Sequence, residues 1–134
     1  LQVVAAIRYI TNGTYLAIIK EMLAAEVCDC MKPLLARVAK MVEQYEAAIN
    51  AVKDAQNQEV HDFLGRRLYD MTAEIIMSLL IIEDASRAPE LFKKSAHVYV
   101  RMAEENVQGK AAYIQNFKAE DLAAFRAVET ETAE

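Results

Sequence analysis

The sequence contains few of the residues that end helices and form tight turns. It has three glycines, two prolines and no tryptophan in 134 residues. Average usage would place about a dozen or more glycines and prolines in a chain of this length. A β-sandwich or β-barrel needs such residues at its many turns, so the composition argues against both classes. Long helices with few connections are therefore expected.

Cysteine and clustered positive charge are also scarce. The two cysteines, Cys28 and Cys30, are separated by one residue. A disulfide between them would close too short a loop to stabilise a domain, so we expect a reducing compartment and a cytoplasmic location. The net charge is −5, and the basic pairs Arg66–Arg67 and Lys93–Lys94 are not part of longer basic runs. Nucleic acid is therefore not an expected partner.

Long apolar runs are absent as well. The longest, Ile75–Ile82, is interrupted only by Ser78 and is far shorter than the roughly 20 residues that a bilayer requires, so no membrane span is predicted. The amino end lacks the basic region and cleavage site of a signal peptide. Because the chain opens with Leu1 inside an apolar helical pattern, we expect it to be part of a longer protein.

The residues that are present favour helices. Apolar residues make up 54% of the chain and recur at spacings of three and four. Asn12–Gly13 predicts a helix stop, and Asn57 predicts a helix cap. The expected helical segments cover residues 1–11, 14–26, 33–52, 58–84, 89–117 and 120–128, followed by a mobile acidic tail at 129–134. This pattern predicts an all-α fold, an antiparallel four-helix bundle with a short extra C-terminal helix.

The helix expected at 58–84 carries the longest apolar stripe. Its predicted inner face consists of Val60, Leu64, Leu68, Met71, Ile75, Leu79 and Ile82. From Ile75 to Ile82 the helix is apolar nearly all round, which predicts that a second surface covers it there. In the helix expected at 89–117, the predicted apolar stripe consists of Phe92, Ala96, Tyr99, Ala103, Val107, Ile114 and Phe117, and Lys110 interrupts it.

Candidate chemical groups do not form a recognisable pattern. A bundle metal site uses Glu-x-x-His, but Gln58 precedes His61 and Lys94 precedes His97 at that spacing. The segment Cys28–Cys30 supplies two soft ligands where a closed zinc site needs four, so we expect two small packed residues near a helix junction. No phosphate-binding loop occurs in the sequence. We therefore predict no catalytic, cofactor-binding or metal-binding residue in this chain.

Three segments resemble a known family. The opening Leu1–Arg8 resembles the apolar-Gln-x-x-x-x-x-Arg stretch that follows a Tyr-Glu-Gly-Thr motif in flavin-dependent acyl-CoA dehydrogenases. His61–Met71 and Leu91–Tyr99 resemble the C-terminal helical extension of a bacterial branch of that family. The resemblance covers essentially the whole chain.

The resemblance implies an oxidoreductase of fatty acid metabolism as the parent protein. In this family a helical domain, a β-domain and a C-terminal helical bundle hold FAD between subunits. A glutamate removes the α-proton of an acyl-CoA thioester while the flavin N5 accepts hydride from the β-carbon, giving a trans-2-enoyl-CoA. In many members that glutamate belongs to Tyr-Glu-Gly-Thr, which this chain does not contain and which would align just before Leu1.

The same resemblance implies a supporting role for this chain. Residues 1–11 would end the last helix of the catalytic domain, and residues 12–128 would form an appended bundle that serves assembly and stability. Ile75, Ile76, Leu79 and Leu80 would contact the rest of the parent chain or neighbouring subunits of a homo-oligomer. FAD and the acyl-CoA substrate would belong to the parent, and the chain alone would hold no cofactor and be inactive.

Two other functions remain open from the residues. One is a free-standing helical interaction module that binds partner helices through the apolar strip. The other is a bundle enzyme or metal carrier, which the missing ligand pattern makes the weakest reading.

Overall fold

The computed structural model describes residues 2–55 and 57–124, with side chains from residue 5 onward. The described residues form helices and contain no strand, which confirms the predicted all-α class. The elements are α1 (Gln2–Thr11), α2 (Thr14–Leu23), the 3-10 helix η1 (Asp29–Met31), α3 (Lys32–Asp54), α4 (Gln58–Arg87) and α5 (Pro89–Asn116). Residues 119–124 are also helical. The rest of the final helix predicted at 120–128, and the predicted acidic tail, lie outside the described residues.

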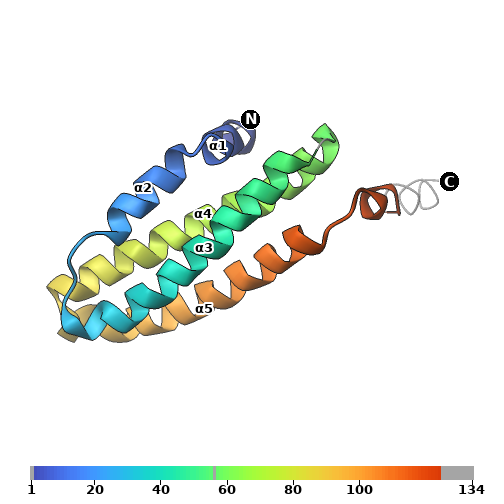
Figure 1. Ribbon diagram of the computed structural model, residues 1–134. Helices are drawn as coiled ribbons and strands as arrows, with labels where there is room; N and C mark the ends of the chain where they lie inside the picture. Colours follow the sequence, from blue (N-terminus) through green and yellow to red (C-terminus); the bar gives the residue numbers. More distant parts are fainter. Residues whose placement is uncertain (1, 56, 125–134) are drawn as a thin grey trace.

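The three long helices α3, α4 and α5 lie side by side and alternate in direction (Figure 1). Helices α1 and α2 both pack on α3 and α4, and together they take the place of a fourth helix. The predicted antiparallel bundle is therefore confirmed, with one of its four members made of two short helices.

Local signals in the sequence set the helix ends. Gly13 adopts φ +88°, a left-handed conformation that ends α1 and separates it from α2. Beside it, the side-chain oxygen of Asn12 accepts a hydrogen bond from the Thr14 N–H at 3.0 Å. The side-chain oxygen of Asn57 accepts from the Glu59 N–H at 2.9 Å and caps α4 as predicted. The two junctions expected from the sequence are thus both present.

The core lies between the long helices. Every residue of the inner stripe predicted for α4 is buried. On α5 three of the six buried residues are alanines, Ala96, Ala103 and Ala111. Small side chains let two helix backbones approach closely, so α5 lies against α4 and α3 along much of its length.

One hydroxyl pair lies inside this core. Tyr45 of α3 is completely buried, and its Oη lies 2.6 Å from the Oγ1 of Thr72 on α4. The Thr72 hydroxyl donates to the Leu68 carbonyl at 2.7 Å, so the Tyr45 hydroxyl donates to Thr72. Burial raises the pKa of Tyr45 to about 12. The pair links α3 to α4 without leaving a buried hydroxyl unsatisfied.

The variant Tyr45→Phe tests this link. It removes one hydrogen bond while Thr72 keeps its bond to Leu68, so we expect a loss of about 0.5–1.5 kcal/mol in the free energy of unfolding at neutral pH. Because the pKa of Tyr45 rises from 10.0 to about 12 on folding, its contribution is complete below pH 10 and is lost as the pH rises toward 12. The free energies of unfolding of the wild type and the variant, measured with urea, should therefore differ at neutral pH and become more alike above pH 10. A difference that stays constant would contradict the assignment.

Candidate functional site

A shallow apolar groove lies between the outer faces of α4 and α5. Met77 on α4 is 50% exposed, and Val98 on α5 is 72% exposed. The groove measures about 350 Å³ and is lined by Met77, Ile81, Ser95, Val98, Tyr99 and Met102. Only Ser95 and the Tyr99 hydroxyl add polar groups to this lining. Apolar side chains gathered at the surface in this way are typical of contact sites for another protein surface.

Two of the four residues predicted to contact a partner do not lie at the surface. Ile75 is 0% exposed and Leu79 is 4% exposed, so that part of the prediction is wrong. The two are one helical turn apart and share the face of α4 that enters the bundle core. Ile76 is half-buried against the same core, and Leu80 is 42% exposed. Of the four, Leu80 alone presents a largely open side chain.

Sequence reasoning missed the α5 side of the groove. The stripe predicted for this helix passed through Ala96, Tyr99 and Ala103, and it left Val98 and Met102 unassigned. These two apolar residues are four apart, so they share a face next to the stripe and not on it. That spacing was the available signal. A helix that already has one apolar face for the core and carries a second apolar face is expected to make another contact.

Polar side chains also join α5 to α4. The Oε1 of Glu74 on α4 accepts a hydrogen bond from the Asn106 Nδ2 at 2.9 Å, and its Oε2 lies 3.7 Å from the Lys110 Nζ. This ion pair explains why a lysine interrupts the apolar stripe of α5. Burial raises the pKa of the nearby Tyr99, and the Glu74 carboxylate raises it further. These groups are engaged with one another across the helix interface, which suits packing rather than proton transfer.

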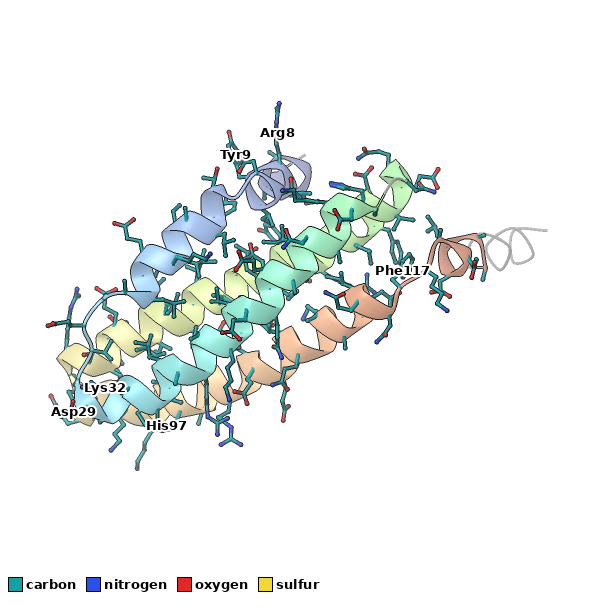
Figure 2. All side chains as sticks on the ribbon, in the orientation of Figure 1. Arg8, Tyr9, Asp29, Lys32, His97 and Phe117 are labelled. Carbon is teal, nitrogen blue, oxygen red and sulfur yellow. The ribbon has the colours of Figure 1, made fainter. Side chains whose placement is uncertain are left out.

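The histidines and cysteines lie apart from the groove lining. His97 is exposed on the surface of α5 (Figure 2), while His61 is half-buried with its Nδ1 3.9 Å from the Asp62 Oδ1. Within residues 2–55 and 57–124, no three or more His, Cys, Asp or Glu side chains gather where they could hold a metal ion.

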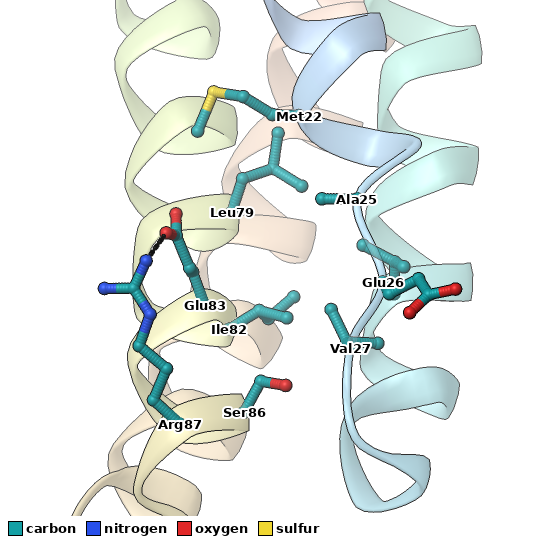
Figure 3. Close-up of a pocket in the computed structure, with 10 residues that line it drawn as sticks. Met22, Ala25, Glu26, Val27, Leu79, Ile82, Glu83, Ser86 and Arg87 are labelled. Carbon is teal, nitrogen blue, oxygen red and sulfur yellow. Dashed lines mark hydrogen bonds and ion pairs between the residues drawn. The ribbon is translucent and has the colours of Figure 1, made fainter.

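A second hollow, of about 270 Å³, lies between α4 and the segment that follows α2 (Figure 3). Its apolar wall includes Met22, Leu79 and Ile82. The Arg87 guanidinium at its edge forms an ion pair with the Glu83 carboxylate one turn earlier on α4. A cation already paired in this way is poorly placed to bind a second anion.

None of the described helices is long and apolar enough to cross a membrane.

Comparison with known proteins identifies the family. A family model described as the acyl-CoA dehydrogenase C terminal matches residues 11–122. The chain belongs to the acyl-CoA dehydrogenase family. A search of curated proteins finds no match.

A solved structure agrees with this acyl-CoA dehydrogenase assignment. The crystal structure of the acyl-CoA dehydrogenase family protein from Porphyromonas gingivalis is 36% identical, with a TM-score of 0.79. The similarity covers 85% of this chain and 98% of that one. Helices α2 to α5 of this acyl-CoA dehydrogenase C-terminal domain all fall within the family match. The resemblance seen in the sequence is thus confirmed, and a free-standing interaction module is not favoured.

Proposed function

We propose that this chain is the C-terminal helical domain of a flavin-dependent acyl-CoA dehydrogenase that oxidises acyl-CoA thioesters to trans-2-enoyl-CoA. Within that parent, the domain supports assembly and stability through the α4–α5 groove. The observation that carries the proposal is the exposure of Met77, Val98 and Met102 in a chain of this family. Each apolar Å² removed from water at such a contact contributes about 25 cal/mol.

Three hollows on the described surface do not fit FAD. The pyrophosphate of FAD needs backbone N–H groups or basic side chains, as at a helix N-terminus. The groove is lined almost entirely by apolar side chains. The hollow beside Phe117 carries Asp121 and no basic residue, and the one in Figure 3 offers only the paired Arg87. The proposal therefore places FAD, the acyl-CoA substrate and the reacting residues on another part of the parent protein.

The proposal includes a division of the chain. Residues 1–11 would end the last catalytic helix, and residues 12–128 would form the appended bundle. The family match begins at residue 11, the last residue of α1, and Gly13 separates α1 from the rest. We further propose a cytoplasmic homo-oligomer that acts in fatty acid metabolism.

Expression of the proposed full-length parent, from a reading frame that extends upstream of Leu1, tests the proposed dehydrogenase activity. We expect the parent to purify with flavin absorbance and to reduce an artificial electron acceptor when given an acyl-CoA. The 134-residue chain alone should show neither property. Stoichiometric FAD on the isolated chain, or turnover of a thioester by it, would overturn the proposal.

The role of the groove is tested in the parent with Val98→Asp. A carboxylate at this position would have to lose its water on contact, so we expect assembly to weaken at least about tenfold, the equivalent of 1.4 kcal/mol. Gln108→Asp, at an exposed position on the same helix, is the matched control and should leave assembly unchanged. Leu80→Asp tests the sequence-based prediction for that residue in parallel. Light scattering after size-exclusion chromatography measures the mass, and an unchanged mass for Val98→Asp would contradict the role of the groove.

A further inference from the structure

The two cysteines lie side by side in the segment between α2 and α3. The Sγ atoms of Cys28 and Cys30 are 2.7 Å apart, and both side chains are half-buried. The turn that begins η1 produces this approach, since the Met31 N–H donates to the Cys28 carbonyl at 3.0 Å. A disulfide bond is about 2.05 Å long, so a small displacement would join the two sulfurs.

Neighbouring elements hold the pair in place. The Cys28 N–H donates to the Oγ of Ser86, near the end of α4, at 2.6 Å. Ser86 also lines the hollow in Figure 3. Asp29, between the two cysteines, forms an ion pair with Lys32 at 2.7 Å, and Figure 2 shows both at one end of the bundle. The two cysteines are thus held against α4, and both remain partly accessible to water.

The two thiols differ in their chemistry. A hydrogen bond from the Cys30 thiol is the main cause that lowers the pKa of Cys28. Donating that bond raises the pKa of Cys30, and burial raises this pKa further. The positive charge of Lys93 lowers it and offsets part of the rise. Because the thiolate is the reactive form, Cys28 is the better nucleophile and Cys30 keeps its proton longer.

We propose that Cys28 and Cys30 form a reversible dithiol–disulfide site that exchanges with low-molecular-weight disulfides, with Cys28 as the attacking thiol and Cys30 as the resolving thiol. This site is independent of the proposed function of the parent. The sequence predicted two small packed residues here, and the structure adds that their sulfur atoms lie next to each other.

The exchange has two steps. The Cys28 thiolate attacks one sulfur of the small disulfide, so that a mixed disulfide forms and one small thiolate leaves and takes up a proton. Cys30 then loses its proton and attacks the Cys28 sulfur, which forms the internal disulfide and releases the second small thiolate. The protein dithiol loses two electrons, and the small disulfide is reduced to two thiols.

Peptide mapping of the folded protein tests the site. Trypsin cleaves after Lys20 and Arg37 but resists cleavage between Lys32 and Pro33, so both cysteines fall in one peptide, residues 21–37. After treatment with oxidised glutathione and quenching in acid, we expect this peptide to have lost two hydrogen atoms and to carry no glutathione. Dithiothreitol should restore its original mass. A peptide that carries glutathione without an internal bond, or that reacts only in urea, would overturn the proposal.

The two single variants test the separate roles. Cys30→Ser keeps the attacking thiol without the resolving one, so we expect it to accumulate one stable glutathione adduct. Cys28→Ser removes the attacking thiol together with the hydrogen bond that raises the pKa of Cys30, so only burial still raises that pKa. In Cys30→Ser the serine hydroxyl can still donate to the Cys28 sulfur, so we expect Cys28→Ser to react more slowly than Cys30→Ser. Circular dichroism of each variant checks the fold. Equal rates for the two variants would contradict the assignment of Cys28 as the attacking thiol.

Discussion

Replacement of Ile75 by alanine is expected to lower the free energy of unfolding by about 2–5 kcal/mol. Ile75 is 0% exposed in the middle of α4, inside the bundle core. Removal of three carbon atoms there loses their transfer free energy and leaves a cavity that close-packed neighbours fill only in part. Urea unfolding of the 134-residue chain, followed by far-ultraviolet circular dichroism, measures the loss.

Leu80→Ala is the matched control for this prediction. Leu80 lies on the same helix and is 42% exposed, so its truncation should change the free energy of unfolding by no more than about 1 kcal/mol. A loss for Ile75→Ala as small as the loss for Leu80→Ala would contradict the core position of Ile75 and favour the contact role that the resemblance implies for it. The two variants therefore separate a core residue from a contact residue within one apolar stretch.

Gly65→Leu is expected to destabilise the chain by about 1–3 kcal/mol. Gly65 is buried on α4 where α1 crosses it, and a Cβ added there would lie 2.6 Å from the Cδ1 of Ile7 and 3.3 Å from its Cγ2. Leucine favours a helix over glycine by about 0.8 kcal/mol, which the clash exceeds. Because both Cγ atoms of Ile7 are also close, the Ile7 side chain or α1 itself has to shift to admit the leucine.

A second substitution shows whether this clash is the cause. Ile7→Ala makes room opposite residue 65, so the double variant Ile7→Ala with Gly65→Leu should lose at least about 1 kcal/mol less than the sum of the two single losses. Urea unfolding of the four proteins in the cycle measures the coupling. Additive losses would mean that the leucine disturbs the chain elsewhere.

The helix junctions at Gly13 and Asn57 could be predicted because their causes are local, whereas α2 ends at Leu23 instead of residue 26 and α4 ends at Arg87 instead of residue 84. Gly13 ends α1 by its own conformation, and Asn57 caps α4 with its own side chain. The buried stripe of α4 could be predicted from spacing alone, because the continuous apolar face of an amphipathic helix packs against the core.

The candidate contact surface could not be predicted as well, because it depends on which helices are neighbours. Between Ile75 and Ile82 every face of α4 is apolar except at Ser78, so spacing cannot tell the face that enters the core from the face left open. The packing of α5 makes that choice. Lys110 likewise became intelligible only beside Glu74, which is distant in sequence. The approach of the Cys28 and Cys30 sulfurs depends on the turn at η1, which composition does not specify.

The break at Gly13 has a consequence for the order in which the bundle forms. It leaves α1 and α2 with ten residues each, whereas an isolated helix in water needs about 12–15 residues to persist. Neither short helix can form securely before it docks, but α3, α4 and α5 can assemble on one another. The long hairpins therefore act as a template, and we expect α1 and α2 to open before α3, α4 and α5 when stability is lowered.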